Sequence, residues 1–220
     1  MIDPGEISTL SHGTRFEETL PTGVRWSHAL HSPRLRAGDI VVDATAGNGH
    51  DTLFLMRHVL PGGRVFTFDV QSQALEETRK KIASHEAFIS NPDCITLIHA
   101  GHETMDRHLP AEMRGQIRAF MFNLGYLPSG DKTKFTAAGT TLSALRMASE
   151  WLAEYGVITV VCYPGHAGGD TEADAVEQWA AHLPSEAFEA QKIAFLNLEG
   201  SPPRCIVVRK RTRISARKCD

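Results

Sequence analysis

The sequence predicts an α/β fold in which a mostly parallel seven-stranded sheet carries helices on both faces and ends in an antiparallel hairpin. Short runs rich in β-branched and aromatic residues alternate with longer amphipathic segments, as a parallel sheet with crossover helices requires. A glycine turn follows the first apolar run, and a Gly-Ser-Pro-Pro turn separates the last two runs. The 220 residues are enough for one well-buried domain.

The expected strands alternate with expected helices along the chain. Strands are predicted at residues 40–44, 64–70, 94–99, 117–123, 157–163, 190–196 and 204–209. Helices are predicted at residues 23–35, 50–59, 72–89, 138–154 and 171–182, and the last of these has an acidic first turn that complements the helix dipole. The turn at 200–203 is short, so the final two strands should pair antiparallel.

The chain divides into an N-terminal arm at residues 1–23, one domain at 24–209 and a basic C-terminal tail at 210–220. Residues 209–218 hold six Lys or Arg side chains, which are either a solvated, frayed end or an arm that contacts RNA. The formal net charge of −3 means that nucleic acid would have to bind a local patch. No run approaches the roughly 20 apolar residues that cross a bilayer, and the N-terminus lacks a signal-peptide core, so a cytoplasmic protein without a membrane partner is expected.

The four cysteines, Cys94, Cys162, Cys205 and Cys219, are scattered along the chain. A zinc site would require close Cys-x-x-Cys or Cys/His spacing, and a disulfide scaffold would be shorter and richer in cysteine. Buried or incidental thiols are therefore expected. His28 and His31 lie on one expected helix and could ligate a metal, but no third ligand is evident. Packing or substrate contact is favoured for this pair, and no metal is expected.

A glycine turn follows the first strand, in the segment that runs from Asp43 through Gly47 and Gly49 to the next helix. Glycine permits positive φ and lets the backbone approach a ligand closely. The helix after the turn points free N–H groups at whatever occupies it. This pattern suits any dinucleotide-like ligand, and the glycine pair alone is weak evidence.

Two details favour S-adenosylmethionine over NAD. A NAD site uses G-x-G-x-x-G so that a pyrophosphate can lie on the helix N-terminus, but Thr52 stands in place of the third glycine. Asp43 ends the first strand, where a carboxylate would repel a pyrophosphate but would suit the cationic methionine ammonium. Asp69 ends the second strand, twenty residues beyond Gly49, where a carboxylate can bind ribose hydroxyls in NAD and S-adenosylmethionine sites alike.

The predicted cofactor site extends over the ends of four strands. His102 or Glu103, which follow the third strand, would line the adenine edge, although a plain surface loop is an equal alternative. The residues predicted to bind the cofactor are Asp43, Ala46, Gly47, Asn48, Gly49, Asp51, Asp69, Val70, Gln71, His102, Glu103 and Asn123.

The fourth strand ends in Asn123-Leu-Gly-Tyr126, which resembles the Asn-Pro-Pro-Tyr motif of amino methyltransferases with Leu-Gly in place of Pro-Pro. A neutral amine is already nucleophilic, so the enzyme mainly has to align its lone pair with the methyl group. The side-chain oxygen of Asn123 would accept N–H hydrogens, and Tyr126 would stack on a base or pack beside the methyl group. The alternative is a strand-ending Asn in a simple turn.

The fifth strand ends in the loop Tyr163-Pro164-Gly165-His166-Ala-Gly168-Gly-Asp. Glycines at this density make a pliable wall that lets a ligand approach the backbone. His166 would hydrogen-bond the substrate or take the proton lost after N-methylation, or else it is exposed to solvent. Asn123, Tyr126 and His166 are thus the predicted catalytic residues. The predicted substrate-binding residues are Tyr126, Tyr163, Pro164, Gly165, His166 and Gly168.

Three segments together resemble one family, the "putative rRNA methylase" (YtqB-like) group of class I S-adenosylmethionine-dependent methyltransferases. They are residues 42–52 (Val-Asp-Ala-Thr-Ala-Gly-Asn-Gly-His-Asp-Thr), 123–132 (Asn-Leu-Gly-Tyr-Leu-Pro-Ser-Gly-Asp-Lys) and 163–169 (Tyr-Pro-Gly-His-Ala-Gly-Gly). The resemblance runs from about Trp26 to Arg209. Ser129 departs from it, because the family usually has Gly there.

This resemblance implies a Rossmann-like fold and a methyltransferase that modifies tRNA, because the family includes a tRNA 5-aminomethyl-2-thiouridine methyltransferase. The implied acceptor is the exocyclic aminomethyl group of the wobble uridine (nm5s2U to mnm5s2U), and a homodimer is possible. Alternatives stay open at this point. They are an amine methyltransferase acting on rRNA, a small molecule or protein, a non-catalytic S-adenosylmethionine-binding module, and a NAD oxidoreductase.

Overall fold

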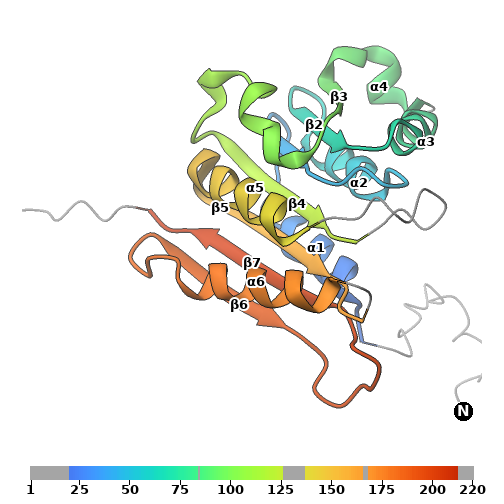
Figure 1. Ribbon diagram of the computed structural model, residues 1–220. Helices are drawn as coiled ribbons and strands as arrows, with labels where there is room; N and C mark the ends of the chain where they lie inside the picture. Colours follow the sequence, from blue (N-terminus) through green and yellow to red (C-terminus); the bar gives the residue numbers. More distant parts are fainter. Residues whose placement is uncertain (1–19, 84, 126–136, 166–167, 213–220) are drawn as a thin grey trace, which may run out of the picture.

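The computed structural model describes residues 20–83, 85–125, 137–165 and 168–212. Its centre is a seven-stranded sheet of order β3-β2-β1-β4-β5-β7-β6 (Figure 1). The strands are β1 (Ile40–Asp43), β2 (Arg64–Asp69), β3 (Ile95–His99), β4 (Ile117–Asn123), β5 (Leu152–Cys162), β6 (Phe188–Ile193) and β7 (Arg204–Lys210). Strands β1 to β5 are parallel, and β7 runs antiparallel to both β5 and β6. The predicted mostly parallel sheet with a terminal hairpin is confirmed.

Helices cover both faces of this sheet (Figure 1). They are α1 (Gly23–His31), α2 (His50–Val59), α3 (Ser72–Ala83), α4 (Glu86–Ser90), α5 (Ala138–Trp151) and α6 (Gly169–Ala181). Three 3₁₀ helices are η1 (Pro92–Cys94), η2 (His102–Arg107) and η3 (Ala111–Met113). No described helix is long and apolar enough to cross a membrane.

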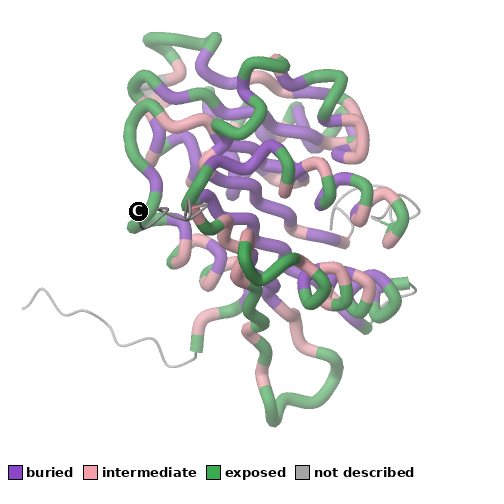
Figure 2. The backbone as a smooth tube through the Cα atoms, turned by 90° about the vertical axis from the view of Figure 1, so that its left-hand side faces the viewer, coloured by how far each residue is buried: buried purple, intermediate pink, exposed green. Residues whose placement is uncertain are grey.

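Successive residues of a strand point to opposite faces of the sheet, and this separates the core into two layers. Val42 and Phe120 pack with α5, α6 and η2, whereas Val41 and Met121 pack with α2 and α3. On the second face, α1 lies against Val161 of β5 and the neighbouring part of β7. Figure 2 shows the buried backbone gathered along the central strands, with exposed segments outside.

Strand order reverses direction beside β1, because β2 and β3 lie on one side of it while β4 and β5 lie on the other. In open α/β sheets, a ligand crevice forms outside the carboxyl ends of the strands at such a switch point. The ends of β1 and β4 therefore define where a site should lie.

Several predicted elements have different bounds in the structure. The helix expected at 23–35 ends at His31, and the strand expected at 157–163 begins at Leu152. The expected helix 72–89 ends at Ala83, and α4 follows after a turn in which the His85 N–H bonds the Ile82 carbonyl. The expected helix 138–154 ends at Trp151, because Leu152 pairs with Ile117 and so already belongs to β5.

The expected strand 190–196 lies two to three residues earlier, as β6. Its register is set by pairing with β7, in which Phe188 opposes Lys210 and Ile193 opposes Cys205. β6 is an edge strand, and its residues do not alternate regularly between buried and exposed positions. Without such an alternation, the sequence could not reveal the register of this strand. Leu196 lies beyond it, fully exposed, in the loop that projects from the body (Figure 1).

Candidate active site

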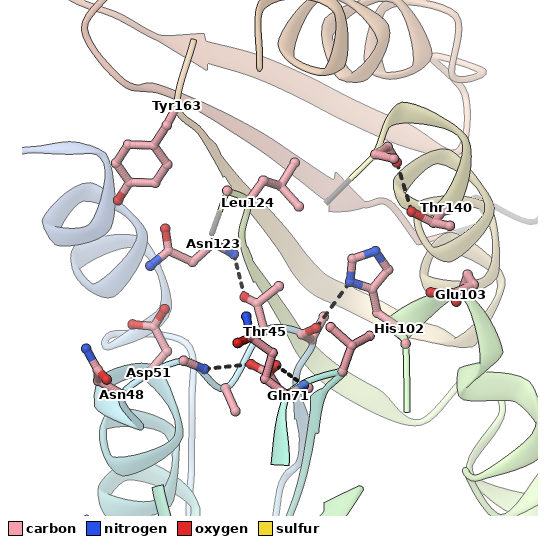
Figure 3. A pocket seen from close by; sticks show the side chains of 18 of the residues that line it. Thr45, Asn48, Asp51, Gln71, His102, Glu103, Asn123, Leu124, Thr140 and Tyr163 are labelled. Atoms are coloured by element: carbon pink, nitrogen blue, oxygen red, sulfur yellow. Dashed lines mark hydrogen bonds between the residues drawn. The ribbon is translucent and has the colours of Figure 1, made fainter. Parts of the chain in front are cut away.

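A cavity of about 680 Å³ lies at the carboxyl ends of β1, β2, β4 and β5, within the size range of small-molecule sites (Figure 3). The described residues that line it are Ala44, Thr45, Ala46, Gly47, Asn48, His50, Asp51, Asp69, Val70, Gln71, Ala100, Gly101, His102, Glu103, Asn123, Leu124, Gly125, Ala137, Thr140, Tyr163, Pro164 and Gly165.

The glycine turn forms one wall of the cavity. Gly47 and Gly49 have φ of 51° and 74°, the left-handed region that glycine adopts without strain. A Cβ on Gly49 would also lie 2.8 Å from the Cα of Thr78 on α3. Gly49 caps α2 and, within the described chain, no side chain caps this helix end. Its first backbone N–H groups therefore remain available to a ligand.

Asp69 braces this turn at the end of β2. One of its carboxylate oxygens accepts the Gly47 N–H at 3.0 Å, and the other accepts the Gln71 N–H at 2.8 Å. A carboxylate oxygen can accept more than one hydrogen bond, so Asp69 can also accept from hydroxyl groups in the cavity. Val70 beside it is 51% exposed and offers an apolar surface to a ring.

The structure corrects the expected role of Asp43, which lies beneath the turn and not in the cavity wall. Its carboxylate is fully buried and accepts hydrogen bonds from the Thr52 hydroxyl at 2.6 Å and the Thr45 N–H at 3.1 Å. Burial first, and then the charge of Asp51, raise the pKa of Asp43 to about 7. Thr52 stands where a NAD site has its third glycine, and here it hydrogen-bonds Asp43. The two residues together support the turn from beneath.

His102 lies in the cavity wall on η2 and not in an exposed loop. Its Nδ1 lies 3.3 Å from the Ala44 carbonyl, and burial lowers the pKa of the ring. A neutral ring that donates from Nδ1 keeps a lone pair on Nε2. That Nε2 is buried and has no hydrogen-bond partner among the described residues. It can therefore accept a hydrogen bond from an amino group of a ligand.

Asn123 ends β4 at the opposite side of the cavity (Figure 3). Its backbone N–H donates to the Thr45 hydroxyl at 2.7 Å, which ties the end of β4 to the glycine turn. Its side-chain Oδ1 is buried, and it lacks a hydrogen-bond partner in the part of the chain that the structure describes. A buried acceptor without a partner is costly, so a ligand N–H is the expected complement.

Tyr163 extends from the end of β5 toward Asn123 (Figure 3). Burial is the main cause that raises the pKa of its hydroxyl, and the Asp51 charge acts in the same direction. The side chain of Asn123 acts in the opposite direction through a hydrogen bond. Tyr163, Asn123 and Asp51 therefore form one polar end of the cavity.

The two histidines of α1 have different surroundings. His31 is buried, its Nε2 lies 3.0 Å from the Thr159 hydroxyl, and burial lowers its pKa to about 3. His28 instead reaches α2, where its Nε2 lies 2.6 Å from Asp51 Oδ1 and its ring stacks on Phe54. Among the described residues, no group of three or more His, Cys, Asp or Glu side chains could hold a metal. His31 packs in the core, whereas His28 supports a residue of the cavity wall.

The structure brings most of the predicted site residues to this cavity. Gly168 does not line it but caps α6 with φ of 84°, and Gly49 supports the turn from behind. Tyr126 and His166 lie outside the described residues, as do Ser129 and Cys219. Cys94, Cys162 and Cys205 are free and buried.

Several wall residues were not predicted from the sequence: Ala44, Thr45, His50, Ala100, Gly101, Leu124, Gly125, Ala137 and Thr140. Most of them are neighbours in the sequence of a predicted site residue, and this adjacency could have indicated that they line the cavity. Ala137 and Thr140 lie at the start of α5 and carry no motif, so only the packing of α5 beside η2 brings them to the cavity.

Comparison with known proteins places the chain among methyltransferases. The profile of the family described as "Putative rRNA methylase" matches residues 65–209. A chloroplastic tRNA (mnm(5)s(2)U34)-methyltransferase of Arabidopsis thaliana is 35% identical over 181 residues, which are 80% of this chain and 65% of that protein. The chain thus spans slightly less than two thirds of that relative's length.

Several solved structures share both fold and sequence with the chain. A "putative rRNA-methylase" from Clostridium thermocellum superposes with a TM-score of 0.80 at 38% identity, over 87% of this chain and 99% of that one. A "putative methyltransferase" from Streptococcus mutans, in complex with SAH, gives a TM-score of 0.75 at 34% identity over the same shares. From the profile match over more than half of its length and these two superpositions, the chain belongs to the "Putative rRNA methylase" family and has the class I methyltransferase fold.

Proposed function

We propose that this protein is an N-methyltransferase that uses S-adenosylmethionine to methylate the exocyclic aminomethyl group of a tRNA wobble uridine (nm5s2U to mnm5s2U). The buried, unpartnered Oδ1 of Asn123 is the observation that carries the acceptor assignment. It lies in a cavity that also has the features required for a nucleoside cofactor.

The residues of the cavity fit S-adenosylmethionine. Asp69 would accept hydrogen bonds from the ribose hydroxyls, and Val70 would pack against the adenine. The unpartnered Nε2 of His102 would accept from the adenine amino group, with Glu103 beside it. The N–H groups at the start of α2 would face the methionine end. When bound, the cofactor supplies a methyl group made electrophilic by the sulfonium.

At the acceptor end, Asn123 would orient the amine. Its Oδ1 accepts one N–H, which directs the nitrogen lone pair toward the methyl group. Proximity and orientation of this kind lower the barrier without a strong general base. The role of Asn123 is therefore to hold the amine nitrogen in line.

The tRNA assignment rests on the relative whose name contains mnm(5)s(2)U34, at 35% identity. An aminomethyl group has N–H donors to offer, which agrees with a cavity end that presents an unpartnered acceptor. The solved relative in complex with SAH supports the cofactor.

The decisive experiment is methyl transfer from labelled S-adenosylmethionine to tRNA that carries the aminomethyl nucleoside, followed by nucleoside mass spectrometry. We expect Asn123→Ala to lower the rate about 100-fold through lost orientation, while S-adenosylhomocysteine still binds. The matched control is Asn91→Ala, because Asn91 is exposed and outside the cavity.

Unchanged turnover by Asn123→Ala would contradict the mechanism. Parallel reactions with total rRNA and a metabolite extract test the identity of the acceptor. Activity on either of them without activity on tRNA would contradict the assignment of tRNA as the substrate.

A further inference from the structure

Asp51 is a wall residue of the cavity, and the sequence predicted a cofactor-binding role for it. It lies in the first turn of α2, its side chain is 7% exposed, and it lines the cavity. Figure 3 shows Asp51, Asn123 and Tyr163 with their polar ends toward one another, from α2, β4 and β5. His102 and Glu103 lie across the cavity from this group (Figure 3).

A second element holds the Asp51 carboxylate in place. His28 reaches over from α1, and its Nε2–H donates to Asp51 Oδ1 at 2.6 Å. The His28 ring stacks on Phe54 with centroids 4.0 Å apart and planes 7° apart. Because α1 is anchored separately through Ser27 and His31 to Thr159, the imidazole is a fixed support. The Asp51 carboxylate is therefore held in one orientation before any ligand binds.

The charge balance of the cavity favours a cationic ligand. The described lining residues include the carboxylates of Asp51, Asp69 and Glu103 but no Lys or Arg. Asp69 already bonds the glycine turn, and Glu103 lies on the far side. Asp51 lies on the same side of the cavity as the side chain of Asn123, whose Oδ1 has no hydrogen-bond partner among the described residues.

We propose that Asp51, oriented by His28, recognises the acceptor amine and stabilises the positive charge that its nitrogen gains during methyl transfer. This inference rests on the proposed function, because it assigns a residue to the amine at the same site. Asp51 is the group that touches the substrate, and His28 is a positioning residue.

Methyl transfer to an amine gives such a carboxylate a role in addition to the alignment of the lone pair. The nitrogen lone pair forms the new N–C bond as the C–S bond breaks, and the bonding pair goes to sulfur. Positive charge thus moves from sulfur to nitrogen, and the product amine carries one proton more than a neutral secondary amine until it releases that proton to water. A preorganised carboxylate beside the nitrogen stabilises this developing charge, whereas an amide of the same shape does not.

The test compares Asp51→Asn, His28→Gln and the matched control His58→Gln on tRNA that carries the aminomethyl nucleoside. His58 also contacts the Phe54 ring and bonds Ser32, but it does not line the cavity. We expect Asp51→Asn to lower kcat about 100-fold. For His28→Gln we expect a smaller loss of about 10-fold, as for the removal of a supporting hydrogen bond. His58→Gln should match the wild type.

Two binding measurements separate this role from a structural or cofactor-binding one. S-adenosylhomocysteine affinity and melting temperature should be the same in Asp51→Asn and wild type. Without cofactor, wild type should bind the aminomethyl tRNA more tightly than the same tRNA lacking that group, and Asp51→Asn should lose the difference.

Wild-type kcat in Asp51→Asn, or a lost affinity for S-adenosylhomocysteine, would overturn the inference. If Asp51→Asn does not fold, His28→Gln decides, and a wild-type kcat in that variant would overturn it equally. A wild-type enzyme that methylates no aminomethyl tRNA would instead refute the proposed function, together with the inference that depends on it.

Discussion

At the residue scale, buried polar side chains next to the cavity are held by short hydrogen bonds to one another. Thr52 donates to Asp43 beneath the glycine turn, while Ser27 and His31 meet at Thr159 behind β5. Each of these groups is out of contact with water, so the loss of one partner leaves the other unsatisfied. They position α1, α2 and the turn without touching the cavity.

His31 should make the stability of the fold depend on pH. Its pKa of about 3 in the folded state is far below the ordinary value of 6.5, because the ring is buried. Between these values the unfolded chain binds a proton that the folded chain does not, so stability falls as the pH falls from 6.5 toward 3. One such group changes the free energy of unfolding by at most about 1.4 kcal/mol per pH unit.

Urea unfolding at pH 7 and pH 5 checks this prediction in wild type and His31→Gln. From pH 7 to pH 5, the free energy of unfolding of the wild type should fall by about 2 kcal/mol more than that of His31→Gln. The exposed His182→Gln serves as the control and should behave like the wild type. Equal pH dependence in wild type and His31→Gln would show that His31 is not the titrating group.

At the element scale, the glycine turn and α2 depend on backbone conformation and on close packing against α3. Gly49 combines a φ of 74° with the approach of Thr78, so it meets both demands that only glycine satisfies. Asp69 completes the arrangement by bonding the Gly47 N–H. A strained turn would tilt the first N–H groups of α2 away from the cavity.

Gly49→Ala should destabilise the protein by about 1–3 kcal/mol and weaken binding of S-adenosylhomocysteine. The loss of stability has two causes. Alanine is strained at this positive φ, and its Cβ would lie 2.8 Å from the Cα of Thr78. Gly139→Ala is the matched control, because Gly139 lies in the first turn of α5 with no heavy atom within 4 Å of an added Cβ. That variant should be neutral or more stable by up to about 1 kcal/mol. Calorimetry and thermal melts measure both effects, and equal outcomes in the two variants would refute this account of the turn.

At the scale of the whole molecule, a bound cofactor should stabilise the entire domain, because its site draws on β1, β2, β4 and β5 at once. A ligand at 100 times its dissociation constant adds about 2.7 kcal/mol. For a protein of this size we expect S-adenosylhomocysteine to raise the melting temperature by about 5–10 °C. NAD should leave it unchanged, and the reverse pattern would revive the dinucleotide alternative. Differential scanning fluorimetry provides the measurement.

Local sequence patterns determined the sheet, the glycine turn and the strand-end side chains of this protein. Alternating apolar runs have the period of buried strands, and glycines at 47 and 49 mark a turn wherever they occur. Because Asp69 and Asn123 each end such an apolar run, they could be placed at strand ends that meet at the switch point. Element ends were less predictable, since the start of β5 depends on a partner in β4 and the register of β6 on one in β7.

Only the tertiary structure decided which polar residues face the cavity. Asp43 and Asp69 both end strands, yet Asp43 points under the turn to Thr52 whereas Asp69 lines the wall. His28 and His31 are neighbours on α1, yet one supports Asp51 and the other packs on Thr159. The direction of a side chain depends on how helices pack on the sheet, and these contacts join residues far apart in the chain. A local pattern of residues contains no information about such contacts, so the sequence identified the chemical groups while packing determined their roles.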